Sequence, residues 1–201
     1  EASDEALALR VNAEFPHRLA KRCGEAGARL IHFSTDCVFT GTKGNYTETD
    51  PPDATDLYGQ SKHQGEVADA HSVTLRTSVI GHELGTKLAL LDWFLSQRGQ
   101  TVNGFTKAIY SGFTTLEMAR IVDRILTQHT DLSGVWHVAS EPISKFGLLQ
   151  LCREKLGWEG VIEPNDEFVC DRSLNADRFN QATGYTPPSW EAVNGELAQQ
   201  P

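Results

Sequence analysis

Two short stretches of the chain carry side chains that could move a proton to or from an oxygen atom. Ser34, Thr35 and Asp36 follow an apolar run, and Tyr58 and Lys62 stand four residues apart in YGQSK. A phenol has a reference pKa near 10, and a neighbouring ammonium favours its ionised form. A tyrosine with a lysine beside it and a hydroxyl opposite therefore predicts general acid–base chemistry on a carbonyl or alcohol oxygen.

The elements around these stretches indicate how the residues could meet. Residues 28–36 (ARLIHFSTD) are typical of a buried parallel strand, so Ser-Thr-Asp falls at its carboxyl end, where open α/β sheets bind ligands. A helix expected over 57–70, capped by Thr55 or Asp56, puts the tyrosine and the lysine on one face. Chance alone gives about 0.14 Y-x-x-x-K matches in a chain of this composition, so this spacing is a weak signal by itself. A strand end turning through polar residues is the better explanation of Ser-Thr-Asp until the two motifs are taken together.

The rest of the chain alternates helix and strand patterns. Such alternation predicts crossover connections, a parallel sheet and an α/β fold. Helices are expected over residues 4–27, with Pro16 as an irregularity, and over 87–97, 115–127 and 143–157, with two more in the tail; strands are expected over 72–81, near 102 and 108, and over 134–140.

Composition excludes several function classes. A net charge of −9 argues against a protein that binds a nucleic-acid backbone. The four cysteines have no C-x-x-C spacing, which is typical of reduced thiols in a cytoplasmic protein, and the seven histidines form no H-x-x-x-H pair, so no metal site is expected. No apolar stretch reaches the roughly 18 residues of a membrane span.

The order of the motifs resembles the extended short-chain dehydrogenase/reductase family. The branch that it resembles most is dTDP-4-dehydrorhamnose reductase and related nucleotide-sugar reductases. The resemblance extends over nearly the whole chain. The first similar segment, VNAEFPHRLAKRCGEAGA, carries the family's asparagine at Asn12. The others are ARLIHFSTDCVFTG, YTETDPP, YGQSKHQGE, LRTSVIG, SGFTTLEMAR and GVWHVAS.

This resemblance implies catalytic roles for three residues. Tyr58 becomes the proton donor, and Lys62 becomes its pKa partner and a ligand of the nicotinamide ribose. Thr35 takes the place of the hydroxyl residue that hydrogen-bonds the reacting oxygen. The resemblance also implies that Ser34, Thr77 and Ser78 contact the cofactor, together with Tyr58 and Lys62, and that Thr35, Asp36, Val79 and Arg172 contact the substrate.

For Arg172 the resemblance implies a place near the phosphates of the nucleotide. A surface ion pair with Asp171 or Asp166 explains this arginine equally well. Two departures from the family pattern, Val79 in place of a tryptophan and Cys37 in place of an aromatic residue, leave the identity of the sugar open.

The family fold is a Rossmann-like, doubly wound parallel sheet with a small C-terminal α/β substrate lobe. We expect residues 1–85 to hold the C-terminal part of the Rossmann domain and residues 86–201 the substrate lobe, interleaved with the last Rossmann elements. The family's glycine-rich turn, G-x-x-G-x-x-G, does not occur in the sequence. The chain therefore resembles an N-terminally truncated member, expected to bind NADPH or NADH poorly alone and to expose an edge that favours a homodimer.

The function that the resemblance implies for the full-length parent is NAD(P)H-dependent reduction of a 4-keto-6-deoxy sugar nucleotide. One alternative is a regulatory or redox-sensing subunit that keeps the fold without catalysis. Another is a nucleotide-sugar epimerase or dehydratase. A dehydratase typically adds an acidic pair beside the central hydroxyl, and this chain offers only Asp36 followed by Cys37, which favours the reductase.

Overall fold

The centre of the molecule is a three-stranded parallel sheet. A computed structural model describes residues 4–85 and 88–192. In it, β1 (Leu30–Phe33), β2 (Ser72–Arg76) and β7 (Gly134–His137) pair in the order β1-β2-β7. Phe33 pairs with Leu75, and Leu75 pairs with Trp136, so all three strands end at one edge. The α/β fold with parallel strands that the sequence predicted is confirmed.

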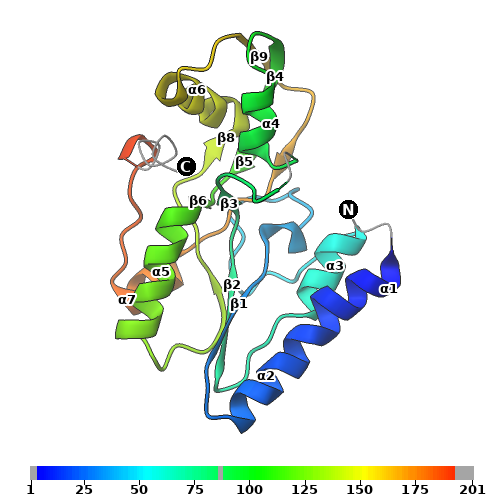
Figure 1. Ribbon diagram of the computed structural model, residues 1–201, viewed down its shortest axis with the longest axis vertical. Helices are drawn as coiled ribbons and strands as arrows, with labels where there is room; N and C mark the ends of the chain where they lie inside the picture. The colour runs from blue at the N-terminus through cyan, green and yellow to red at the C-terminus, as the bar shows by residue number, and fades with distance from the viewer. Residues whose placement is uncertain (1–3, 86–87, 193–201) are drawn as a thin grey trace.

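Helices cover both faces of this sheet (Figure 1). α2 (Phe15–Glu25) and α3 (Leu57–Gln64) lie on one side, and α5 (Thr115–Gln128) and α7 (Asp177–Thr183) lie on the other. α5 begins at the N-cap Thr114, whose hydroxyl accepts a hydrogen bond from the Glu117 amide. Its apolar stripe then packs on the sheet in a cluster of buried residues: Val73, Leu75, Phe113, Met118, Ile121, Ile125, Trp136, Val138 and Phe179.

The N-terminal helix changes its winding before Pro16. α1 (Glu5–Ala8) continues into the π-helical segment η1 (Leu9–Glu14) and then into α2. Proline has no N–H, so Pro16 cannot donate to the carbonyl group of Asn12 one turn earlier. That carbonyl group instead faces Gly65 at the end of α3, where a Cβ atom would collide with its oxygen. The irregularity expected near Pro16 is confirmed, and it brings η1 and α3 into close contact.

A small lobe stands beyond the carboxyl edge of the sheet (Figure 1). Its two parallel strands β4 (Thr101–Phe105) and β9 (Val161–Asn165) pack with α4 (Leu90–Ser96) and α6 (Lys145–Leu156). Below them, β5 (Ala108–Tyr110) pairs with β8 (Ile143–Ser144) and β10 (Cys170–Asp171). The lobe core is apolar and contains Leu91, Phe94, Val102, Leu148, Leu149, Cys152, Trp158 and Ile162.

The chain crosses several times between these two regions. We call residues 88–110 and 141–171 the small lobe, and residues 4–80, 111–140 and 173–185 the sheet half. The short parallel pair of β3 (Val79–Ile80) and β6 (Phe113–Thr114) lies where they join. The carboxyl ends of β1 and β2 therefore point toward the lobe (Figure 1).

Two helix boundaries differ from those expected. The helix expected over 57–70 ends at Gln64, because Gly65 caps it and Val67 turns into the sheet, where its amide donates to the Thr74 hydroxyl at 3.1 Å. The helix expected over 87–97 begins at Leu90, and residues 86–87 lie outside the described residues. The second tail helix is described only up to Ala192.

Within residues 4–85 and 88–192, no helix is long and apolar enough to cross a membrane.

Candidate active site

Ser34, Thr35 and Asp36 are buried at the carboxyl end of β1, as predicted. Thr35 caps the 3₁₀ turn η2 (Asp36–Val38), since its Oγ1 accepts from the Cys37 amide at 3.1 Å. The same hydroxyl donates to Asp36 Oδ1 at 3.2 Å, which is long for a hydroxyl donor. Ser34 uses its hydroxyl differently, donating to Glu66 Oε1 at 2.7 Å.

The helix α3 presents Tyr58 and Lys62 at the same edge of the sheet. Asp56 caps it by accepting from the Gly59 amide at 2.8 Å. The Lys62 ammonium donates to the carbonyl oxygen of Phe33 at 2.6 Å, so it lies directly beside the Ser-Thr-Asp stretch. Tyr58 is 44% exposed, which leaves its side chain accessible to a ligand.

A glycine allows α3 to approach η2, the turn that follows β1, very closely. A Cβ atom at Gly59 would collide with the carbonyl oxygen of Cys37 and with the side chain of Ala54. Only a residue without a side chain allows the first turn of α3 to lie against η2. The same turn carries Tyr58, so the glycine determines the distance between the phenol and the Thr35 segment.

Burial shapes the electrostatics of the site. It lowers the pKa of Lys62, an effect that the negative charge of Glu66 partly offsets. Burial also raises the pKa of the Cys37 thiol, and the neighbouring carboxylate of Asp36 raises it further. Cys37 is therefore a neutral thiol at neutral pH, which is a poor nucleophile.

A pocket of about 180 Å³ lies between the sheet half and the small lobe. Asp36, Ser78 and Arg172, three of the residues proposed from the sequence, line it. Arg172 donates to Cys37 Sγ at 3.3 Å. The acids weighed as its ion-pair partners are engaged elsewhere, since Asp171 accepts from Ser173 and Asp166 pairs with Lys107.

Thr77 and Val79 occupy the neighbouring strand end without lining this pocket. Thr77 is buried after β2, and its hydroxyl donates to the backbone oxygen of Ser78 at 3.3 Å. Val79 is 45% exposed on β3. The structure thus gathers the sequence-predicted residues at one edge, with Asp36, Ser78 and Arg172 around the pocket.

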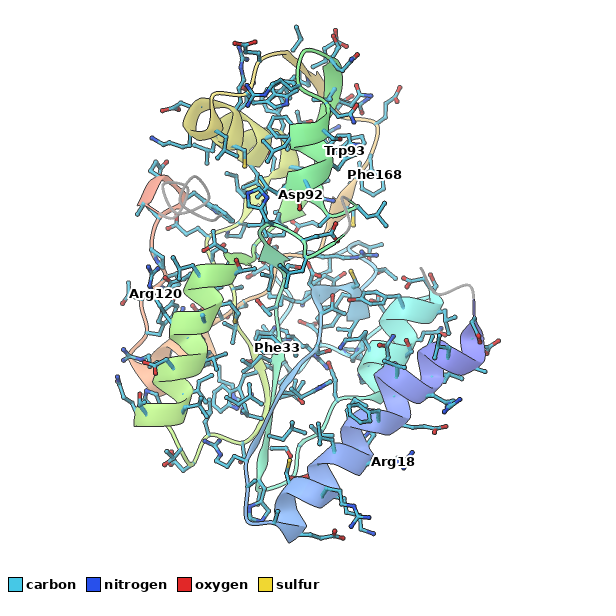
Figure 2. The ribbon with its side chains drawn as sticks, viewed as in Figure 1. Arg18, Phe33, Asp92, Trp93, Arg120 and Phe168 are labelled. Carbon is cyan, nitrogen blue, oxygen red and sulfur yellow. The ribbon has the colours of Figure 1, made fainter. Side chains whose placement is uncertain are left out.

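Sequence reasoning missed several residues of this site. Tyr110, Lys145 and Phe168 line the pocket from the small lobe, and Figure 2 shows Phe168 beside α4. They belong to no recognisable motif, because they come from three separate places: the end of the short strand β5, the start of α6 and the segment between β9 and β10. Glu66, in contrast, is the last residue of the motif YGQSKHQGE. A charged residue is rarely buried without a partner, so its place in this motif was a signal that could have identified it.

No group of three or more His, Cys, Asp or Glu side chains that could hold a metal ion occurs among the described residues. The site brings together a phenol, an ammonium and hydroxyl groups near a small pocket. Such a set suits proton transfer to an oxygen atom.

The comparisons with known proteins show the family and the fold of the chain. The family model described as RmlD substrate binding domain matches residues 1–191. A dTDP-4-dehydrorhamnose reductase from Aggregatibacter actinomycetemcomitans is 30% identical over 92% of this chain and 71% of its own length. The one from Mycobacterium tuberculosis is 46% identical over 71 residues, which are 33% of this chain and only 23% of that relative.

A solved structure shows the same fold. The crystal structure of dTDP-4-dehydrorhamnose reductase from Bacillus anthracis in complex with NADP has a TM-score of 0.80 and 23% identity, and the match covers 96% of this chain and 73% of that one. The Rossmann-like arrangement and the resemblance stated from the sequence are confirmed.

Proposed function

The chain belongs to the RmlD substrate-binding domain family, and from this premise we propose that the whole protein reduces the keto group of a 4-keto-6-deoxy sugar nucleotide with NADPH or NADH. The observation that carries the proposal is the position of Lys62. Its ammonium lies on the Phe33 carbonyl group at the carboxyl end of β1, and Tyr58 lies one turn earlier on the same helix.

The residues that this chain supplies suit the nicotinamide ribose. An ammonium has three N–H donors, and the Phe33 carbonyl group uses one, so Lys62 retains donors for ribose hydroxyls. The glycine-containing loop GTKGN, residues 41–45, suits a pyrophosphate poorly, because Gly44 lies against the carboxylate of Asp171. When bound, the nicotinamide supplies the hydride that reduces the ketone carbon.

The side chains then handle the charge that develops on the ketone oxygen. Tyr58 donates its phenolic proton to that oxygen, and the ammonium of Lys62 stabilises the phenolate left behind. Thr35 donates a hydrogen bond to the same oxygen by giving up its long bond to Asp36. Ser34 has no free hydroxyl hydrogen for a ligand while it donates to Glu66, so its support of the cofactor comes from the backbone.

The pocket between the two regions is the place proposed for the sugar nucleotide. Lys145 and Arg172 line it and carry positive charge toward an anionic diphosphate, while Asp36 and Ser78 offer partners for sugar hydroxyls. Val79 lies on the neighbouring strand β3, outside the pocket lining, and we assign it to the same proposed substrate site. The division into a Rossmann part, residues 1–85, and a substrate part, residues 86–201, which is interleaved with the last Rossmann elements, belongs to the proposal.

A second copy of the chain is the partner proposed besides the substrate. Leu7, Val11 and Phe15 are each more than half exposed and recur every four residues along the N-terminal helix. Large apolar side chains aligned in this way favour burial against another surface.

Replacing Tyr58 by Phe tests the reaction. In the full-length protein, kcat for NADPH or NADH oxidation with keto-sugar nucleotide should fall by about 10²- to 10⁴-fold, because the general acid is lost. KM should change little, since only one hydroxyl is removed. The control is Tyr185→Phe, far from the site on the other side of the sheet, which should keep its rate.

Three results would contradict the proposal. An unchanged rate in the Tyr58→Phe protein would remove the mechanism. No turnover of any keto-sugar nucleotide by the wild type would favour the regulatory or redox-sensing subunit. Conversion of the sugar without net consumption of NADPH or NADH would favour the epimerase or dehydratase.

A further inference from the structure

A chain of buried polar contacts runs along the carboxyl edge of the sheet, beside the proposed active site. It begins at Ser34, directly after β1, and continues through Glu66, just past α3. From there it passes to Arg76 at the end of β2 and to His137 at the end of β7. The side chains of Glu66 and Arg76 are only 6% and 5% exposed. The reaction proposed above assigns no role to either of them.

Glu66 is the centre of this chain of contacts. Its Oε1 accepts from Ser34 Oγ and from Arg76 Nε, both at 2.7 Å. Its Oε2 accepts from Arg76 Nη2 at 2.7 Å and contacts His63 Nδ1 at 3.0 Å. The carboxylate therefore has partners on β1, on β2 and on α3, and the arginine holds it in a bidentate geometry with one orientation.

Arg76 is in turn held from the far side. Its Nη1 lies 3.2 Å from Nε2 of His137, whose Nδ1 contacts the backbone oxygen of Tyr46 at 2.9 Å. Burial lowers the pKa of His137 to about 4, so the ring is neutral at neutral pH. A neutral ring that donates from Nδ1 to Tyr46 accepts at Nε2 from Arg76. Every member of the chain of contacts thus has a defined donor or acceptor role.

This arrangement ties together the two parts that carry the proposed chemistry. Ser34 immediately precedes Thr35, and Glu66 stands four residues after Lys62, just past the end of α3. The Ser34 hydroxyl, directly after β1, is hydrogen-bonded to Glu66 and so links this carboxylate to the end of the strand. A shift of this carboxylate would therefore move the end of β1 relative to the helix that carries Tyr58 and Lys62.

Stability alone does not account for such a pair. A buried ion pair stabilises a fold little, because the loss of hydration offsets the attraction, and apolar residues of the same size can replace it. What a fully bonded polar cluster provides instead is one fixed geometry. A reaction that needs a phenol, an ammonium and a hydroxyl around one oxygen requires such fixed geometry.

We propose that Glu66, oriented by Arg76, is a positioning residue that holds Ser34–Thr35 and the Tyr58–Lys62 helix in the reactive arrangement. This role rests on the function proposed above. Glu66 acts on the end of β1 through the Ser34 hydroxyl. Its negative charge also reaches Lys62, which has His32 of β1 as a further titratable neighbour, with His17 of α2 close to His32.

The test uses Glu66→Gln in the full-length protein, with Glu117→Gln as the matched control. Glu117 is also a buried carboxylate that accepts from a hydroxyl, Tyr185 Oη at 2.7 Å, and from an arginine, Arg120 at 2.8 Å. It lies on α5, across the sheet from α3; Arg120 marks that helix in Figure 2. Glu66→Gln should lower kcat about 10- to 100-fold with KM changed less than about threefold, whereas Glu117→Gln should keep both.

A second readout does not depend on turnover. The titration midpoint of the Lys62 ammonium, followed by NMR of ¹³C-labelled lysine, should be lower in Glu66→Gln than in the wild type and unchanged in Glu117→Gln, because a nearby negative charge is lost. Glu66→Asp, which keeps the charge, should retain the wild-type midpoint better than Glu66→Gln. If Glu66→Gln does not fold, Ser34→Ala removes the link to β1 alone and should lower kcat in the same way.

Equal losses of kcat in Glu66→Gln and Glu117→Gln would overturn the proposal, because they would indicate a general structural effect. An unchanged kcat in folded Glu66→Gln, or in folded Ser34→Ala, would overturn it as well. If the wild type turns over no keto-sugar nucleotide, the proposed function fails, and an unchanged Lys62 midpoint in Glu66→Gln would then refute this inference separately.

Discussion

The sheet half and the small lobe are held together by different interactions. The small lobe has an apolar core built around Phe94, Leu148 and Trp158, and none of the buried polar residues of the described chain lies in it. The sheet half contains them all. Nine lie at or shortly after the end of a strand, namely Ser34, Thr35, Asp36, Arg76, Thr77, Ser111, His137, Ser140 and Ser173, and the others are Ser61, Ser72, Thr74, Thr114, Glu117 and Thr183.

This contrast separates two tasks within one small protein. Apolar packing is non-directional, so it fixes the shape of the lobe but does not by itself orient polar groups. Buried hydrogen bonds are directional, so they fix the atoms that would act on a substrate. The stability of the lobe should therefore fall when buried apolar volume is removed. The stability of the sheet half should fall when a buried charge or hydrogen bond is removed.

The largest expected effect is on the lobe core. Leu148→Ala, at a fully buried position of α6, should lower the free energy of unfolding by about 3 kcal/mol, because it leaves a cavity among packed side chains. Urea denaturation measures this loss. Leu126→Ala, at a position of α5 that is 53% exposed, is the control and should cost little. A loss below about 1 kcal/mol at Leu148 would show that packing is not what holds the lobe.

The next largest effect is a loss of stability at acidic pH that arises in the sheet half. The folded-state pKa of His137, about 4, lies below its reference value of 6.5, because burial disfavours the charged ring. The unfolded chain therefore binds the proton more readily, and stability that is present above pH 6.5 is lost as the pH falls toward 4. Between pH 7 and 5 the loss should be about 2 kcal/mol.

Comparing His137→Gln with the wild type isolates this contribution. The variant should lose less unfolding free energy between pH 7 and 5, while His71→Gln, at an exposed position, should behave as the wild type does. An identical loss in His137→Gln and the wild type would show that acid acts elsewhere.

The smallest effect compares the same deletion in the two regions. Tyr185 in the sheet half donates to Glu117 Oε1 at 2.7 Å, so Tyr185→Phe should cost about 1.5 kcal/mol of unfolding free energy. Tyr110 in the small lobe has a buried hydroxyl oxygen with no hydrogen-bond partner among the described residues. Tyr110→Phe should therefore be neutral or slightly stabilising. If both changes cost the same, the distinction between the two regions does not extend to hydrogen bonding.

The sequence predicts the sheet half better than the lobe, for physical reasons. A buried parallel strand leaves an apolar run, and a helix beside it leaves a capping residue and a spacing of four, so residues 28–36 and Asp56 were informative. Strands such as β8 and β10 are two residues long and leave no periodic pattern. The helix that begins at Lys145 was expected from the sequence, but its place beside the pocket depends on these short strands and could not be predicted.

The sequence also did not reveal which side chains contact each other. Sequence motifs identified Ser34 and Asp36 as site residues, yet the partner of the Ser34 hydroxyl, Glu66, comes from a contact 32 residues away. The length of the helix expected over 57–70 was wrong because the glycine at position 65 ends it. That glycine is required by close contact with Asn12, a tertiary effect that local propensity does not contain.

The close approach at Gly59 has a consequence for recognising such proteins in sequence collections. A tyrosine and a lysine four residues apart carry little information, because the pair recurs by chance. Requiring glycine directly after the tyrosine adds a steric condition, and glycine makes up only 17 of these 201 residues. Random matches would satisfy that condition less than one time in ten, so adding the smallest residue of the motif removes more than nine in ten chance matches.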